Sequence, residues 1–218
     1  AQRVWIWLAL SLDRLHRTPE ALTALDRLKS ALPAGDPLAA EVWYWEGDVS
    51  RRDGQMVRAK LAFSRLIEQF PQAPWTAQAR LGLGLVYLSQ QAFRQAREQF
   101  REVSMRNPEG VAALDARLLE GLCLVRLQRF EEAAGVLRVC LSAAKEPEMI
   151  AQAAFYLGEA LSGLKRYDPA LEAYRRAIEA LPSSKWQSLS LFGVGWAQFQ
   201  LRDCEESLAT LSRYLEEP

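Results

Sequence analysis

Two tryptophan pairs are the residues in this chain whose spacing most suggests a binding site. Residues 4–7 read VWIW and residues 42–45 read VWYW, so Trp5 and Trp7 are followed by an equivalent pair, Trp43 and Trp45. Neighbouring aromatic side chains can enclose a ligand, or they can recur because the chain repeats itself and buries them. The rest of the sequence has to separate these two explanations.

Residue types used in catalysis are scarce. His16 is the only histidine, which argues against a histidine-based metal site or catalytic relay. The spacing of Cys123, Cys140 and Cys204 matches no zinc or redox motif, so we expect small buried residues on helices. The glycines are isolated, so no phosphate-binding loop is formed. We therefore expect no enzyme activity, no metal and no cofactor.

The charge balance narrows the classes of partner. Lys+Arg and Asp+Glu both number 27 in 218 residues, so no net charge attracts nucleic acid or an anionic membrane. No apolar run reaches the roughly 18 residues that span a bilayer, so no membrane insertion is expected. The chain opens AQRVWIWLAL, without an initiator Met or a leader, and we expect it to be a piece of a longer protein.

A repeat runs through the whole chain. Glycines recur every 37 residues, at Gly47, Gly84, Gly121, Gly158 and Gly195, and Ala9 holds this place in a first copy. Twelve residues after each stands a small residue: Ala21, Ala59, Ala96, Ala133, Ala170 and Ser207. Sixteen after each stands a large apolar residue: Leu25, Phe63, Phe100, Leu137, Tyr174 and Leu211. Six copies follow, over about 2–38, 40–76, 77–113, 114–150, 151–187 and 188–218.

Each copy predicts two antiparallel helices. Apolar residues recur at helical spacing over 154–164 and again over 170–181. Small residues let two helices approach closely, and the large residue fills the space beside them. A single helix pair cannot bury its apolar faces, but stacked pairs can. We therefore predict an all-α solenoid of about six two-helix repeats, forming one domain over residues 1–218.

The pattern resembles the tetratricopeptide repeat family over the whole chain. The best copies are Leu83-Gly84, Tyr87, Ala96, Phe100, Pro108 and Leu157-Gly158, Ala170, Tyr174, Ala177, Pro182. The resemblance implies a right-handed superhelix, with first helices lining a concave groove that binds protein partners. The repeats are longer than the family's usual 34 residues. Their joints, FPQAPWTA and LPAGDPLA, resemble those of bacterial cell-envelope proteins, which implies the periplasm or envelope, with the cytoplasm as the alternative.

The resemblance also places the tryptophans. Trp5 and Trp43 occupy the family's signature position, which faces the helix–helix core. Trp7 and Trp45 lie two residues on, about 200° around the helix. We expect them at the edge of the inner surface, stacked over each other, either as a site or as packing between neighbouring helices.

The family's groove positions, mapped onto this chain, give a candidate partner-binding site. The residue types at these positions change from the first repeats to the last. The candidate residues are Tyr44, Trp45, Asp48, Arg51, Arg52, Leu81, Leu85, Leu88, Leu118, Leu122, Val125, Arg126, Phe155, Glu159, Phe192, Trp196 and Phe199. The early copies carry charges of both signs at these positions, whereas the later copies carry apolar residues. A contiguous exposed area of apolar residues usually marks an interaction surface. We expect the groove to bind an apolar or amphipathic segment of a partner protein.

Two other functions stay open from the sequence. The apolar sixth copy predicts either self-association, giving a homo-oligomer, or burial under a neighbouring repeat. A nucleic-acid-binding helical array is a weaker alternative, disfavoured by the neutral net charge.

Overall fold

The computed structural model describes residues 2–216, apart from the side chain of Val111, and within them it contains twelve α-helices and no strand. The helices are α1 (Arg3–Arg14), α2 (Thr18–Ala31), α3 (Leu38–Arg52), α4 (Met56–Gln69), α5 (Thr76–Ser89), α6 (Phe93–Arg106), α7 (Val111–Arg126), α8 (Phe130–Ala143), α9 (Pro147–Gly163), α10 (Tyr167–Ala180), α11 (Lys185–Gln200) and α12 (Cys204–Glu216). The predicted all-α solenoid of six two-helix repeats is confirmed.

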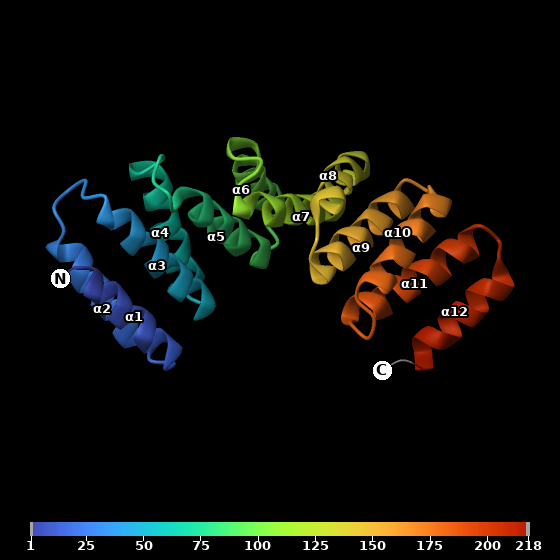
Figure 1. Cartoon of the computed structure of the whole chain (residues 1–218), viewed down its shortest axis with the longest axis horizontal. Coiled ribbons are helices and arrows are strands. Elements are labelled where there is room, and N and C mark those ends of the chain that lie inside the picture. The colour runs from blue at the N-terminus through green and yellow to red at the C-terminus, as the bar shows by residue number, and fades with distance from the viewer. Residues whose placement is uncertain (1, 217–218) are drawn as a thin grey trace. The chain divides into compact units, whose positions relative to one another are not determined.

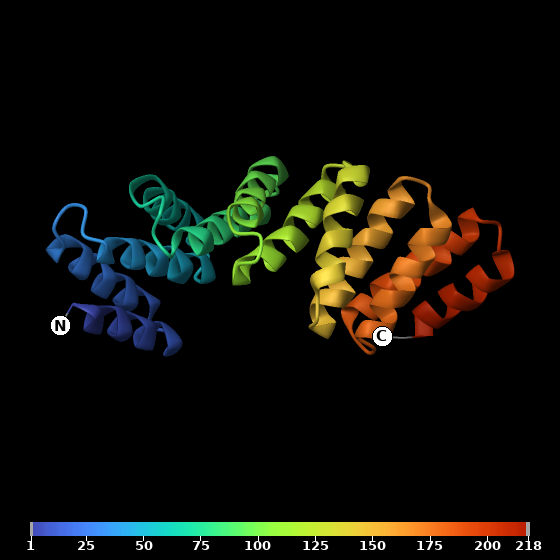
Figure 2. The ribbon, with the colours of Figure 1, turned by 45° about the horizontal axis from the view of Figure 1, so that its top comes forward.

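The chain forms two compact units, Ala1–Arg106 with α1–α6 and Asn107–Pro218 with α7–α12. Each unit holds three helix pairs, whose helices can be followed in Figures 1 and 2. In both, the first helix of a repeat packs on its own second helix, and that second helix packs on the first helix of the next repeat. The single domain expected over residues 1–218 stays a prediction.

The recurring glycines explain how closely the helices of one repeat approach. A Cβ on Gly158 would lie 2.5 Å from the Tyr174 ring, and one on Gly47 would lie 2.5 Å from the Phe63 ring. Because real Cβ atoms do not come so close, a larger residue would push the helices apart. The same contact joins Gly84 to Phe100, Gly121 to Leu137 and Gly195 to Leu211. The predicted pairing of each glycine with the large residue sixteen positions on is confirmed.

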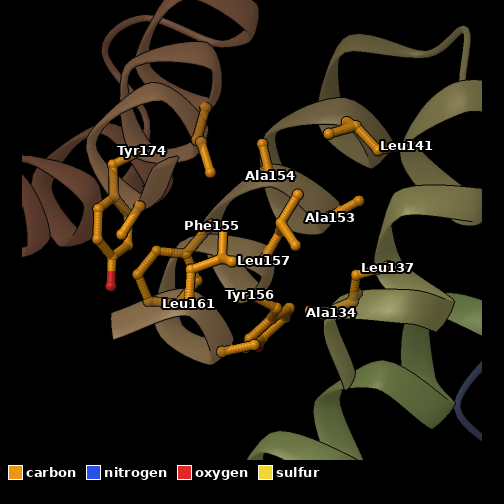
Figure 3. Close-up of a cluster of buried hydrophobic side chains, with 14 of the residues drawn as sticks. Ala134, Leu137, Leu141, Ala153, Ala154, Phe155, Tyr156, Leu157, Leu161 and Tyr174 are labelled. Atoms are coloured by element: carbon orange, nitrogen blue, oxygen red, sulfur yellow. The ribbon is translucent and has the colours of Figure 1, made fainter. Parts of the chain in front are cut away.

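The second unit has a continuous apolar core from α7 to α11. Figure 3 shows its central part, where Phe155 and Tyr174 lie together with ring centroids 6.0 Å apart. The first unit has two clusters, one around Leu25 and Val42 and one around Phe63 and Ala79. Each of these clusters joins a second helix to the first helix of the following repeat.

A charged network also joins the first two repeats. The buried carboxylate of Glu46 on α3 accepts hydrogen bonds from Lys29 on α2, at 2.6 Å, and from Arg58 on α4, at 2.8 Å. Asp26 on α2 accepts from both cations as well. The Lys29 ammonium also lies 4.3 Å from the centre of the Trp43 ring. Two cations therefore balance two carboxylates at a helix junction, an arrangement that helical periodicity does not reveal.

The cysteines differ from one another in burial. Cys123 and Cys140 are buried on helices, as predicted, and burial raises the pKa of the Cys140 thiol to about 11. The prediction is wrong for Cys204, which lies exposed at the first position of α12. Among the described residues, no three His, Cys, Asp or Glu side chains form a cluster that could hold a metal ion. No helix in residues 2–216 is both long and apolar enough to cross a membrane.

Candidate functional site

The second unit contains a groove lined mainly by the first helices of its three repeats, with one residue each from α8 and α10. A cavity of about 580 Å³ lies between the C-terminal end of α7, the C-terminal end of α9 and the middle of α11. Its lining is Val125, Arg126, Gln128, Phe130, Glu159, Ser162, Gly163, Tyr174, Phe192, Gly193 and Trp196. The lining includes five of the candidate groove residues: Val125, Arg126, Glu159, Phe192 and Trp196.

The floor of this groove is polar. The Tyr174 hydroxyl donates a hydrogen bond to Glu159 at 3.1 Å, and the Ser162 hydroxyl lies 3.4 Å from it. Burial, and then the negative charge of Glu159, raise the pKa of Tyr174. Tyr174 therefore stays a neutral hydrogen-bond donor. Its hydroxyl holds one oxygen of the half-buried Glu159 carboxylate, which lines the cavity.

An exposed aromatic row on α11 begins at the groove, where Phe192 and Trp196 line the cavity, and continues beyond it to Phe199. Phe192, Trp196 and Phe199 on α11 are 54%, 48% and 55% exposed. Their ring contacts are few: Trp196 lies 6.0 Å from Phe199, and Phe192 lies 5.9 Å from Tyr214. Three large apolar side chains in a row on one helix form the kind of exposed patch that marks an interaction surface.

The remaining candidate residues of the second unit lie deeper. Leu118 and Phe155 are buried in the core cluster and do not line the cavity, and Val125 is buried although it reaches the cavity wall. Leu122 is half-buried beside the same cluster. These residues support the groove from beneath, so their direct contact with a partner stays a prediction.

In the first unit the candidate charges pair with one another. Asp48 accepts from Arg51 at 3.0 Å and from Arg52 at 3.1 Å, and Arg52 also donates to Asp13 on α1. Burial alone would lower the pKa of Arg52, but Asp48 and Asp13 outweigh it and raise that pKa. These side chains are largely satisfied within the protein. Leu81, Leu85 and Leu88 are half-buried along α5.

Sequence reasoning missed Trp75, which lies at the start of α5. Tyr44 stacks on its ring with centroids 4.8 Å apart, and Trp45 approaches it at 5.7 Å. Trp75 also lines a cavity of about 820 Å³ in the first unit, together with Phe70, Pro71 and Pro74. The available signal was the segment FPQAPWTA between the second and third repeats, which carries all four of these residues where the repeat is longer than usual.

The structure separates the two tryptophan pairs. Trp43 is buried, as predicted for the signature position, but the prediction is wrong for Trp5, which is 38% exposed on α1; among the described helices, α1 contacts only α2 and α3. Among the described residues, the ring contacts of Trp45 are with Tyr44 and Trp75 and not with Trp7. Trp45 packs against the apolar cluster of the first repeat, which favours packing over a ligand site.

Solved structures with the same fold include several repeat proteins. A tetratricopeptide repeat protein from Parabacteroides merdae ATCC 43184 is 16% identical, with a TM-score of 0.78 over 99% of this chain and 79% of that chain. The apo form of RapI is 14% identical, with a TM-score of 0.80 over 98% of this chain and 63% of that chain. MamA 41-end from Desulfovibrio magneticus RS-1 is 17% identical, with a TM-score of 0.71 over 82% of this chain and 94% of that chain. At these identities the likeness shows the fold alone.

Sequence comparison identifies the family. The chain matches none of the curated proteins. One tetratricopeptide repeat profile matches residues 7–74 and 81–147, and a second matches residues 151–184, so together they cover most of the chain. The same residues form the helix pairs whose glycines contact the large residue of the second helix. The chain belongs to the tetratricopeptide repeat family.

Proposed function

We propose that this protein is an interaction scaffold that binds an extended apolar segment of a partner protein in the groove of its second unit. The observation that carries the proposal is the exposed row of Phe192, Trp196 and Phe199 beside the 580 Å³ cavity. A partner side chain that entered the cavity would remove apolar surface from water on both molecules, which is favourable by about 25 cal/mol for each Å² buried.

The polar groups of the groove suggest how such a segment would be oriented. Glu159 and Arg126 line the same cavity and carry opposite charges. A bound segment in extended conformation would present backbone N–H groups to the Glu159 carboxylate and backbone carbonyls to the exposed Arg126 guanidinium. Apolar contacts would then supply most of the affinity, and these two residues would set direction.

The test is a screen of displayed peptides against the whole chain, followed by affinity measurement on the selected peptides by fluorescence polarisation. Trp196→Ala should weaken binding at least tenfold, because buried aromatic anchors dominate such interfaces. Trp7→Ala is the control, since it removes a tryptophan of the first unit that is more exposed than Trp196, 68% against 48%, and it should leave affinity unchanged.

Two results would contradict the proposal. Selected peptides that bind Trp196→Ala as tightly as the unmodified chain would place the site elsewhere. Substitution of Trp75 by alanine separates the alternatives further: a loss there, with full binding by Trp196→Ala, would move the site to the 820 Å³ cavity of the first unit.

A further inference from the structure

The groove of the second unit contains a half-buried carboxylate that is not balanced by a cation of the described chain. Glu159 on α9 accepts a hydrogen bond from the Tyr174 hydroxyl at 3.1 Å. Within residues 2–216, no Lys or Arg side chain lies within ion-pair distance of Glu159. Because part of its surroundings is protein and not water, this fixed charge attracts a cation more strongly than a carboxylate in open solvent would.

The same position in the second repeat shows which partner such a carboxylate takes. Asp48 occupies the place of Glu159 in the 37-residue repeat. It forms ion pairs with Arg51 at 3.0 Å and with Arg52 at 3.1 Å. After Glu159, the places of these two arginines are held by a serine and a glycine, residues 162–163. The fifth repeat therefore keeps the carboxylate but lacks the guanidinium groups that pair with it.

The small residues leave a space that aromatic rings line. A Cβ on Gly163 would lie 2.6 Å from the Phe130 ring, so a larger residue here would displace this ring from the cavity lining. The other aromatic residues that line the cavity are Tyr174, Phe192 and Trp196. Aromatic faces attract cations, and a planar guanidinium can also stack on them. Inside this protein, the Arg65 guanidinium already lies 5.1 Å from the centre of the Trp43 ring.

We infer that the cavity takes an arginine side chain of the partner segment, whose guanidinium pairs with Glu159 among the aromatic rings. That the partner is a protein segment rests on the proposed function, and the arginine specifies which segment fits. Charge-assisted hydrogen bonds are about twice as strong as neutral ones, so a guanidinium would displace a backbone N–H from Glu159.

Arg126 lines the same cavity and would repel a second guanidinium. Its side chain is exposed, so water and salt screen its charge. Glu159 is half-buried and therefore acts more strongly on a cation that enters the cavity. Arg126 keeps its place at the rim, where it would meet the backbone carbonyls of the segment.

The experiment compares arginine with citrulline, its uncharged isostere, in two kinds of ligand. The direct probe is N-acetylarginine amide, titrated into the isotope-labelled whole chain and followed by backbone amide NMR shifts. Shifts at Ser162, Gly163 and Gly193 should saturate with this probe and be absent with the citrulline analogue. In peptides selected against the whole chain, replacing arginine by citrulline should weaken binding about tenfold, as expected for loss of one charge-assisted hydrogen bond.

Two variants link this preference to the carboxylate. Glu159→Gln keeps the size of the side chain and an acceptor for Tyr174, and it should bind arginine and citrulline peptides equally. Ser162→Arg rebuilds the pairing seen in the second repeat, so the chain's own guanidinium should occupy Glu159 and abolish the preference. Glu172→Gln removes an exposed carboxylate of α10 that does not line the cavity, and as the matched control it should keep the full preference. Circular dichroism should be unchanged in all three variants.

Three results would overturn the inference. Selected peptides that lose affinity for Trp196→Ala, but contain no arginine or bind equally with citrulline, would leave the proposed function standing without the arginine site. An arginine probe that shifts none of the three amides has no site in this cavity. Arginine-dependent shifts that persist in Glu159→Gln would place the guanidinium elsewhere. By contrast, shifts that require Glu159, together with peptides that are insensitive to Trp196→Ala, would support the arginine site and contradict the proposed function.

Discussion

At the scale of single residues, Glu46 shows how strongly neighbours decide the role of a side chain. Its position is apolar in several other repeats, yet its carboxylate is buried and is satisfied by Lys29 and Arg58. Burial alone would raise the pKa of Asp26 in the same network, but hydrogen bonds from Arg58 and Lys29 outweigh it and lower that pKa. A lowered folded-state pKa contributes stability above the ordinary pKa of aspartate, and this contribution is lost as the pH falls through the acidic range.

Glu46→Ala should therefore destabilise the first unit. The change leaves two half-buried cations with only Asp26 to balance them, and we expect a loss of about 2 kcal/mol in the free energy of unfolding, less than for a fully buried pair. Urea titration followed by circular dichroism measures it. Glu102→Ala removes an exposed ion pair with Arg106 and should cost much less. Equal losses in the two variants would contradict this account of the network.

At the scale of helices, the space between repeats is filled by pairs of residues whose sizes compensate. Phe63 contacts Gly47 of its own repeat and Gly82 of the next, and Tyr174 likewise lies between Gly158 and Gly193. Where the second helix carries leucine instead, the residue equivalent to Gly82 is large: Leu25 shares a cluster with Trp45, and Leu137 with Tyr156. This compensation gives a packing reason for the large Trp45 side chain at the position equivalent to Gly82.

Gly193→Ala should separate α11 from α10. The new Cβ would lie 2.6 Å from the buried Tyr174 ring, and overpacking of this kind costs about 1–3 kcal/mol. Gly135→Ala, on the exposed side of α8, meets nothing within 4 Å and should instead stabilise by up to about 1 kcal/mol, because alanine favours helix. Urea titrations measure the free energy of unfolding of both variants relative to the unmodified chain. Two shifts of the same sign would show that the close approach at Gly193 does not limit stability.

At the scale of the whole molecule, each of the two units has its own apolar core. The core of the second unit draws all its buried members from residues 118–197, and both clusters of the first unit lie before residue 87. In repeat proteins, stability is roughly the sum of repeat stabilities and of contacts between neighbours, so three stacked repeats can suffice.

We therefore expect residues 107–218, produced alone, to fold. The fragment should show a helical circular dichroism spectrum and a cooperative thermal transition, and it should bind the peptides selected by the whole chain with affinity within about threefold, since the groove lies within this unit. A fragment that is helical but melts without a cooperative transition would show that its core depends on the first unit.

The sequence by itself determined the family, the number of repeats and the identity of each helix. It could do so because glycine, alanine and large apolar residues recur at spacings that only two closely packed helices require. The sequence also predicted exposed aromatic residues on the first helix of the sixth copy, since Phe192, Trp196 and Phe199 recur there at helical spacing; their role in a partner site stays a prediction.

Only the tertiary structure decided which candidate residues are accessible. Helical periodicity fixes the direction of a side chain relative to its own helix, but burial depends on helices that are distant in sequence. Leu118 and Phe155 occupy predicted groove-facing positions, yet neighbouring residues bury them. Val4 and Leu208 occupy positions that are buried in other repeats, yet they are exposed to solvent. The cross-repeat partners of Glu46 and Tyr44 are hidden from the sequence for the same reason, because the distance between two side chains is set by packing and not by spacing along the chain.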